Sequence, residues 1–416
     1  MKNCRSTRDR WVWLARIIMI TSVSLVVVHA DAAETIDASK YPNLQAAFDA
    51  VPATGGIVKI PPGEFRISQP LVISKSETRV VGSGAATKIV NLNTNGKPAL
   101  MVRPANRDQD KNARIWRVQL ADFRICGDPQ AIDAKSTKPT SGDGLVAEGI
   151  QELYIHGLSI DHHGGYGLHM IDCYEDPRIS DNIFTYNRKA GVRIEAGHDI
   201  VVSANHFEEN QDALQCVDSF NLCMTGNNID DHLGNGVIIE NTYGSVLSGN
   251  MIEECNGTAI ILDRDCYGIT ISANVIAHDF GGGVDLRHAW GCAVSANTFV
   301  LDPGFSLRVG KHSGRITVTG NSFTNSHIGG TAQTRRKVEQ DLAHGIVLEQ
   351  TSDINITGNQ FSGLQTSAVE SRGQCHRILV ANNILVDLNR ATQGIGPALK
   401  LASVEQGLIN NNLGAN

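Results

Sequence analysis

The amino-acid sequence predicts an all-β solenoid, a single-stranded parallel β-helix built from coils of about 23 residues. The first observation is a phrase of the form Ser/Thr-x-Asn-x-Phe/Ile, whose central Asn recurs at spacings of 22–24 residues, interrupted by gaps of 38 and 29. The second is that each period holds short β-type runs separated by Gly, Asn or Asp, without a helical pattern. The central residues are Asn182, Asn205, Asn227, Asn250, Asn274, Asn297, Asn321, Asn359, Asn382 and Asn411.

These Asn residues predict the shape of each coil. Stacked side-chain amides can hydrogen-bond along the axis of the solenoid, and Asn tolerates the left-handed backbone that sharp corners need. We therefore expect about eleven coils, with the Asn side chains in one row along the axis.

Residues 1–30 have the pattern of a secretory signal peptide. Five basic residues precede an apolar stretch at 17–28, and a small-residue cleavage site follows at 28–30. The apolar stretch is short for a bilayer span, although an uncleaved membrane anchor is the alternative. We predict a secreted or periplasmic protein that has no membrane association once the signal is removed.

Net charge and cysteine content indicate which binding partners, disulfides and metal sites to expect. Residues 1–30 carry five basic residues and one acidic residue, so the rest of the chain changes from a net charge of −7 to about −11. Such an acidic chain is a poor general binder of nucleic acid. Eight cysteines remain after residue 30, an even number that permits disulfides, and no Cys-x-x-Cys or His/Cys cluster suggests zinc.

Residues 31–110 differ from the regular repeat and are expected to form an N-terminal cap and the first coils. Residues 44–51 have the pattern of a short amphipathic helix, and residues 55–65 predict a strand, a proline turn and a second strand. A solenoid needs an atypical end unit to cover its apolar core, which suits this helix. Residues 111–416 are expected to form the β-helix, with loops at 127–142 and 325–343.

The segment from Tyr41 to Ile73, which ends Gly-Gly-Ile-Val-Lys-Ile-Pro-Pro-Gly-Glu-Phe-Arg-Ile, resembles the N-terminal region of pectate-lyase-like proteins and phage tailspikes. The coils that follow resemble the right-handed β-helix repeats of the same superfamily. The resemblance implies a right-handed solenoid in which one sheet lines a substrate groove. It does not imply a single reaction, because the superfamily contains lyases, hydrolases, epimerases and proteins without activity.

A strand that follows each Asn phrase by about ten residues is expected to form this groove. Alternation sorts its residues into an inward apolar column and outward polar columns. The expected inward residues are Leu168, Met170, Val192, Ile194, Leu214, Val237, Ile239, Ile260, Leu262, Val284, Leu286, Leu307, Val309, Ile346, Leu348 and Val369.

The outward positions supply the candidate site. The predicted catalytic residues are Glu240, Asp263, Asp265, Asp285, Arg287 and His288. The predicted substrate-binding residues are His169, Arg193, Glu195, Gln215, Arg264, Arg308, Lys311 and His312. The alternative is a solvated sheet face with rows of ion pairs, which any β-helix with outward acids would show.

The candidate residues allow two kinds of chemistry. Arg287 and His288 can bind a sugar carboxylate and accept a proton, as β-elimination requires. Glu240 and Asp263 lie one coil apart, and Asp263 and Asp285 lie diagonally, roughly 8 Å apart, which suits glycoside hydrolysis. The phrase Asp285-Leu286-Arg287-His288 resembles the Leu-Arg-His motif of alginate and chondroitin lyases, although Arg264 stands where those enzymes carry a lysine base.

Several alternatives stay open. The Gly-His-Gly phrase of polygalacturonases and the Asp-Pro-His-Asp phrase of mannuronan epimerases do not occur. The leading expectation is a polysaccharide lyase acting on a uronate-containing polymer, followed by a glycoside hydrolase, a sugar epimerase and a non-catalytic carbohydrate-binding surface protein. The scarcity of aromatic residues in the outward columns favours an enzyme over a binding module. No metal site is expected, apart from a possible Ca²⁺ stripe at Glu208, Glu209, Asp230, Asp231, His232, Glu253, Glu254 and His278, for which a solvated edge is the alternative.

Overall fold

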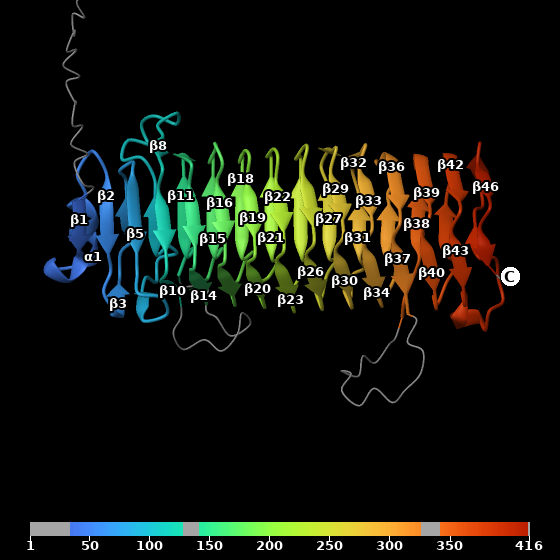
Figure 1. Cartoon of the computed structure of the whole chain (residues 1–416), viewed down its shortest axis with the longest axis horizontal. Coiled ribbons are helices and arrows are strands. Elements are labelled where there is room, and N and C mark those ends of the chain that lie inside the picture. The colour runs from blue at the N-terminus through green and yellow to red at the C-terminus, as the bar shows by residue number, and fades with distance from the viewer. Residues whose placement is uncertain (1–33, 128–140, 326–341, 415–416) are drawn as a thin grey trace, which may run out of the picture. The chain divides into compact units, whose positions relative to one another are not determined.

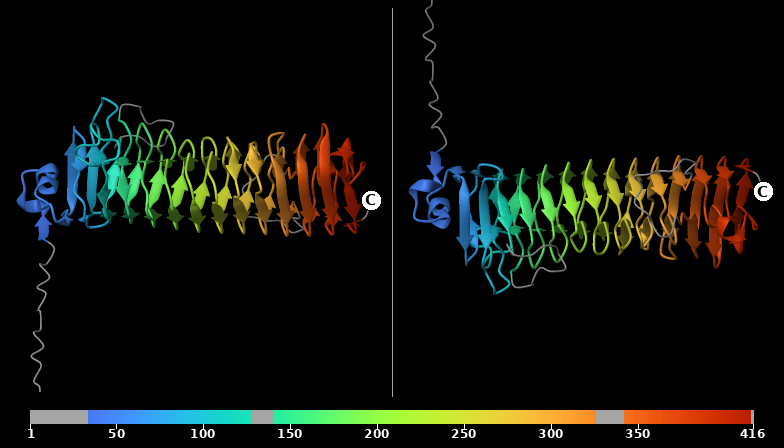
Figure 2. Two further views of the ribbon diagram at one scale, coloured as in Figure 1. Left: turned by 90° about the horizontal axis from the view of Figure 1, so that it is seen from above. Right: turned by 90° about the horizontal axis from the view of Figure 1, so that it is seen from below.

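The structure is a computed structural model that describes residues 34–127, 141–325 and 342–414. In these ranges the chain winds into a long stack of coils, and three parallel sheets run the length of the stack (Figures 1 and 2). The parallel β-helix is therefore confirmed. The predicted signal peptide and most of the two predicted loops lie outside the described residues.

Sheet C is the sheet that was expected to line the groove. It has 13 strands in the described part of the chain. They are β4 (Leu71–Ile73), β7 (Leu100–Val102), β11 (Leu145–Glu148), β15 (Leu168–Ile171), β18 (Val192–Glu195), β21 (Leu214–Val217), β24 (Val237–Glu240), β27 (Ile260–Asp263), β31 (Val284–Leu286), β35 (Leu307–Val309), β38 (Ile346–Glu349), β41 (Val369–Arg372) and β44 (Leu399–Lys400).

Sheet B precedes sheet C in each coil. Its 14 strands within the described ranges are β3 (Gly63–Ile67), β6 (Thr87–Asn91), β10 (Arg124–Cys126), β14 (Ser159–Asp161), β17 (Ile183–Thr185), β20 (His206–Glu208), β23 (Asn228–Asp230), β26 (Met251–Glu253), β30 (Val275–Ala277), β34 (Thr298–Val300), β37 (Ser322–Thr324), β40 (Gln360–Ser362), β43 (Ile384–Val386) and β47 (Leu413–Gly414).

Sheet A follows sheet C and completes the coil. Its strands are β1 (Glu34–Asp37), β2 (Gly56–Lys59), β5 (Thr78–Val81), β9 (Gln119–Ala121), β13 (Tyr154–His156), β16 (Arg178–Ser180), β19 (Val201–Ser203), β22 (Cys223–Thr225), β25 (Val246–Ser248), β28 (Cys266–Tyr267), β29 (Thr270–Ser272), β32 (Ala289–Trp290), β33 (Ala293–Ser295), β36 (Gly314–Thr319), β39 (Ser352–Thr357), β42 (Cys375–Ala381), β45 (Val404–Glu405) and β46 (Leu408–Asn410). A separate pair joins β8 (Ile115–Trp116) to β12 (Ile150–Gln151).

The Asn phrase forms the corner between sheets A and B. Asn182 is buried, and both its backbone N–H and its Nδ2 donate to Oδ1 of Asn205 at 3.0 Å. The same pattern repeats from coil to coil, so the predicted row of Asn residues is confirmed. Every buried amide in this Asn ladder therefore finds partners, as buried polar groups require.

The end of the Asn ladder corrects the prediction by one residue. Asn383 and Asn412, rather than Asn382 and Asn411, continue the row. Asn382 and Asn411 instead have φ values of 56° and 51°, in the left-handed region. In the other coils this left-handed position precedes the ladder Asn and is held by Asp181, Ala204, Gly226, Gly249, Ala273, Ala296, Gly320 and Gly358. The residue before the ladder, rather than the ladder Asn itself, makes the sharp corner.

The inward columns form the core as expected. All sixteen of the predicted inward residues are buried. Phenylalanines stack inside the coils, and the rings of Phe299, Phe323 and Phe361 lie 4.7 Å apart in nearly parallel planes. This regular filling supports the strand register on which the site depends.

The N-terminal part contributes more coils than expected. The predicted helix is present as α1 (Leu44–Asp49), which begins at the N-cap Asn43 and buries Leu44, Ala47 and Phe48. A short 3₁₀ turn, η1 (Ala38–Lys40), precedes it, and a second, η2 (Arg390–Thr392), lies near the other end of the stack. The role of α1 in closing the end of the stack stays a prediction. The fourteen strands of sheet B exceed the eleven coils predicted, because residues 63–126 already pair in register with the repeat.

Two further features concern the cysteines and the helices. The eight cysteines after residue 30 are free thiols, and all except Cys223 are buried, including Cys216. Within residues 34–127, 141–325 and 342–414, no helix has the length and apolar character needed to cross a membrane.

Candidate functional site

The outward face of sheet C brings the predicted residues into two columns. In the first, His169, Arg193, Gln215, Ile238, Ile261, Asp285 and Arg308 follow one another in register. In the second, Glu195, Val217, Glu240 and Asp263 do the same. The predicted alignment of coils is therefore correct at these positions.

Asp285 faces outward but has no exposed surface. Arg287 donates from Nε to its Oδ2 at 2.7 Å, and Arg308 donates from Nε to its Oδ1 at 2.8 Å and from Nη2 to Oδ2. The bond to Asp285 raises the pKa of Arg308. Two guanidinium groups thus bind one carboxylate. The expectation that Asp285 meets a substrate directly is wrong, because the arginine side chains cover it.

Glu240 and Asp263 are the accessible acids on the strands of the predicted catalytic group, which we call the patch. They occupy paired positions on neighbouring strands, and both are partly exposed. Arg264 donates to Glu240 at 2.8 Å and lies 3.5 Å from Asp218. The hydrogen bond to Glu240 raises the pKa of Arg264. Asp263 lies 3.9 Å from Arg287 and caps the backbone N–H of Arg264. Each acid therefore has a cation beside it.

The remaining predicted residues lie at the edge of the same patch. The rings of His288 and His312 are 5.7 Å apart, and His312 is exposed beside the exposed Lys311. Asp265 is exposed and has a φ of 69°. These side chains follow the ends of the strands, where they can reach a molecule lying on sheet C.

A second polar cluster lies on strands β15, β18 and β21, on the N-terminal side of the strand that carries Glu240. Arg193 donates to Glu195 at 2.8 Å and to Gln215 at 2.7 Å. His169 has Nδ1 at 3.4 Å from Asp143 and Nε2 at 3.5 Å from Glu195, the latter within ion-pair distance but without hydrogen-bond geometry. The predicted substrate-binding residues His169, Arg193, Glu195 and Gln215 therefore form one network.

Besides Asp143, sequence analysis missed three further members of this cluster. The ring of Tyr166 lies 4.9 Å from the ring of His169 and 4.6 Å from Nζ of Lys189. Burial raises the pKa of Tyr166. Asp212 accepts from Gln215 at 2.7 Å. Tyr166, Lys189 and Asp212 lie on the turn before each strand, and strand alternation gives no information about turn residues.

The loop over residues 103–114 lies against the N-terminal coils of sheet C. The side chain of Arg107 is almost fully buried and binds Glu148 at 3.0 Å and Asp172 at 2.5 Å. Arg114 also binds Asp172, at 2.7 Å. These ion pairs fix the loop beside the second cluster and bound the polar face at that end.

The corner between sheets B and C holds a buried polar column. Its members in successive coils are His163, Asn187, Asn210, His232, Cys255, Asp279 and Asp302. Burial raises the pKa of Asp279 to about 8 and that of Asp302 well above its usual value. Burial also lowers the pKa of His163 and His232 to about 4. His232 therefore does not belong to the exposed stripe considered for Ca²⁺.

One cluster has the residue types of a metal site. The ligand atoms of Cys126, Asp161 and His162 lie within 4.8 Å of one another, which sequence spacing did not reveal. Both carboxylate oxygens of Asp161 already accept from Arg124 at 2.7 Å, and His162 Nδ1 lies 2.6 Å from one of them. Burial raises the pKa of Cys126 to about 12, which disfavours the thiolate that binds metals. An Arg-Asp-His ion cluster accounts for this arrangement.

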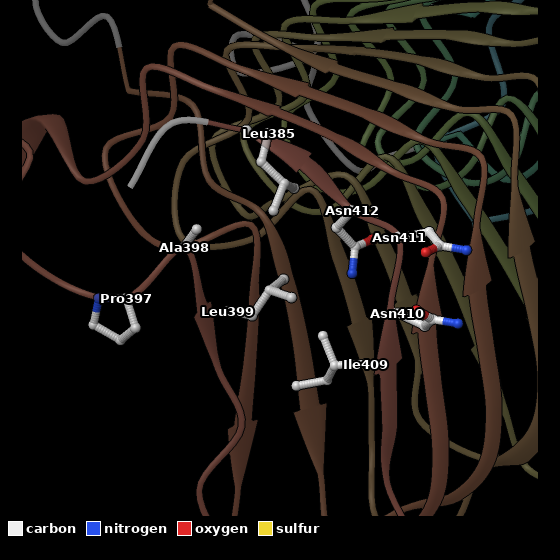
Figure 3. A pocket seen from close by; sticks show the side chains of 9 residues that line it. Leu385, Pro397, Ala398, Leu399, Ile409, Asn410, Asn411 and Asn412 are labelled. Atoms are coloured by element: carbon white, nitrogen blue, oxygen red, sulfur yellow. The ribbon is translucent and has the colours of Figure 1, made fainter.

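A cavity of about 440 Å³ lies at the C-terminal end of the stack (Figure 3). Its lining includes Leu385, Leu399, Ile409 and Asn410, and it contains no ionisable side chain. Because it belongs to the last coils and lacks groups for acid–base chemistry, we place the candidate site on sheet C instead.

Comparisons with known proteins agree with this architecture. The family described as "right handed beta helix region" matches residues 143–338 and 235–413. A search of curated proteins finds no match. Among solved structures, the chain is similar to DFA-IIIase from Arthrobacter chlorophenolicus A6 in complex with GF2, with a TM-score of 0.54 and 11% identity over 79% of this chain and 95% of the other.

Two further solved structures share the fold. A mannuronan C-5 epimerase A-module from Azotobacter vinelandii has a TM-score of 0.50 and 15% identity, over 92% of this chain and 99% of the module. A surface adhesin of Streptococcus pneumoniae has a TM-score of 0.52 and 14% identity, over 81% of this chain and 92% of the other. At these identities the likeness shows the fold alone. The family match covers more than half of the chain, and the protein belongs to the right-handed β-helix family.

Proposed function

We propose that this protein is a carbohydrate-active enzyme that binds an anionic, uronate-containing polysaccharide on sheet C and cleaves it by β-elimination. The observation that carries the proposal is the pair of arginines around Asp285. Arg287 and Arg308 share one buried carboxylate, and both arginine side chains stay partly exposed on the outward face of sheet C, with Asp263 3.9 Å from Arg287. Such a group suits a sugar carboxylate, and a neutral sugar would not need it.

The elimination would use the residues around this pair. Arg287 or Arg308 would neutralise the substrate carboxylate, which makes the proton on the neighbouring C5 acidic. His288 would take that proton, the electron pair would form the C4–C5 double bond, and the C4–O bond would break. The departing oxygen would take a proton from Lys311 or water. Asp285 would act as a positioning residue that holds both arginines.

Hydrolysis is the second candidate, and the register of Glu240 and Asp263 favours it. These two acids are partly exposed on adjacent strands, whose backbones lie about 5 Å apart. Paired carboxylates at short separation suit a retaining glycosidase. Arg264 lies beside Glu240 and Arg287 beside Asp263, so a hydrolytic role for these acids would have to break both ion pairs.

The test is a panel of alginate, polygalacturonate, chondroitin and neutral polysaccharides, with products followed by ultraviolet absorbance and by new reducing ends. Elimination yields an unsaturated sugar that absorbs in the ultraviolet, and hydrolysis yields reducing ends without absorbance. Reducing ends alone would reject elimination in favour of hydrolysis. The absence of both signals on every polymer would reject the proposal that the protein cleaves polysaccharide.

Substitution of Arg287 assigns the activity to this patch. We expect Arg287→Ala to lower kcat/KM at least about a hundredfold, because the charge that neutralises the substrate carboxylate is lost. The matched control is Glu370→Gln, which removes a charge from the same face of sheet C several coils away. Equal effects of the two substitutions would show that the site lies elsewhere.

A further inference from the structure

Aromatic side chains line the corner where sheet C turns into sheet A. Pairings between coils place them in one file along the axis, with Gln151 filling one position. We call this file the aromatic row, and its members are Trp116, Tyr174, His198, Phe220, Tyr243, Tyr267 and Trp290. In Figure 1 the strands that carry the two tryptophans, β8 and β32, lie along the same upper edge of the stack.

The rings of the aromatic row are partly open to solvent and loosely spaced. Trp116, Phe220 and Tyr267 are 39%, 43% and 60% exposed, and the other four members are half-buried. The three ring pairs from Tyr174 to Tyr243 are 5.4–6.0 Å apart and inclined, at 85° between His198 and Phe220. The buried phenylalanines, by contrast, stack at 4.7 Å in nearly parallel planes. Packing within the row therefore leaves ring surface uncovered, and a long exposed apolar file is typical of an interaction surface.

Hydrogen-bonding groups flank the rings on both sides, toward sheet A and toward sheet C. Asn221 donates to Asp199 at 2.7 Å beside Phe220. Asn241 donates to Asp218 at 2.8 Å and accepts from the hydroxyl of Tyr243 at 2.9 Å. Amides and carboxylates next to exposed rings offer hydroxyl partners and an apolar face together, which is the combination that a sugar ring presents in return.

We propose that the aromatic row is an extended binding site for a polysaccharide chain that runs along the axis of the stack. Equal spacing over eight coils fits a polymer rather than a compact ligand, and the acidic chain disfavours nucleic acid. Tyr243, Tyr267 and Trp290 directly follow the strands or turns of Glu240, Asp263 and Arg287, so one polymer can reach both surfaces. This inference rests on the proposed carbohydrate function, and it adds a binding site outside sheet C.

The test compares the double variant Phe220→Ala/Tyr267→Ala with Phe280→Ala. Phe280 is 55% exposed but lies on the corner between sheets B and C, which makes it a matched control. Migration in native gels that contain each uronate polymer measures binding, and thermal unfolding checks folding. We expect the double variant to bind polymer at least about tenfold more weakly, because it loses two exposed rings. We expect KM for polymer to rise by a similar factor while kcat stays within about twofold.

Each outcome decides between the two proposals. If the native protein cleaves a polymer and the double variant binds and cleaves it equally well, the aromatic row is rejected and the proposed function stands. If the native protein neither binds nor cleaves any polymer, both proposals fail. If the native protein self-associates in sedimentation and the double variant does not, the row belongs to a contact between copies and the polysaccharide site is rejected.

Discussion

Asp285 shows how a single residue can face outward and still be structural. Its carboxylate is covered by Arg287 and Arg308, so removing it would leave two guanidinium groups without their shared partner. We expect Asp285→Ala to lower the free energy of unfolding by about 1–3 kcal/mol, since charge-assisted hydrogen bonds are lost while the two arginines remain partly exposed to water. Chemical denaturation checks this. A loss under about 1 kcal/mol would show that the carboxylate is not holding the arginines.

Asp279 is a second single residue whose effect on stability can be tested, here through its dependence on pH. Its position in the buried column is held by Asn in the coils of Asn187 and Asn210, and among the described residues its buried Oδ2 has no hydrogen-bond partner, which disfavours the charged form. Burial raises the pKa of Asp279 to about 8, so the folded state binds a proton that the unfolded state releases above about pH 4. Stability from this group is therefore fully present at low pH and is lost as the pH rises toward 8.

Replacement of Asp279 by Asn should remove this loss. We expect Asp279→Asn to raise the free energy of unfolding at about pH 8.5 by at least about 1 kcal/mol and to have little effect at about pH 5. Urea denaturation at both pH values measures the difference. An equal effect at both would contradict a titrating Asp279.

The Asn ladder is the element that sets the corner of each coil. Asn227 accepts from the backbone and side chain of Asn205 and donates to Asn250. We expect Asn227→Ala to cost at least about 3 kcal/mol, because several buried groups lose their partners together. The neighbouring Asn228→Ala is the control, since Asn228 is only half-buried and lies outside the ladder. Similar losses in thermal unfolding would argue against the ladder.

Much of the coil and of the candidate site could be predicted from the sequence, and the parts that could not be predicted have physical reasons. The period of the Asn phrase gave the coil, and strand alternation separated the inward residues from Arg193, Glu240 and Asp263. Alternation could not reveal that Asp285 is covered, because two long arginine side chains from this and the next strand fold over it. Nor could it place Tyr166 or the aromatic row, since corner residues follow no two-residue period. Asn382 and Asn383 are adjacent and both fit the period, and the hydrogen bonds show that Asn383 joins the ladder.

At the scale of the whole molecule, each coil contacts its neighbours on two sides except at the ends. The last coils expose Leu408, Ile409 and Leu413, whereas the central inward residues are fully buried. A stack of this kind unfolds locally from its ends. We expect amide hydrogen exchange, followed by mass spectrometry, to be at least about tenfold faster over 399–414 than over 237–286. Uniform protection would indicate that the stack opens only as one unit.

The Asn ladder also bears on the length of the protein. Each rung makes the same bonds to the rung on either side, so the stack has a translational symmetry that no single coil breaks. Removal of residues 228–250 would bring Asn227 opposite Asn274 with the same donors and acceptors, and duplication of that unit would add one more equivalent rung. The number of coils is thus a variable that duplication or deletion of whole units can change while the ladder contacts are kept, whereas a loss of two or three residues would break the corner.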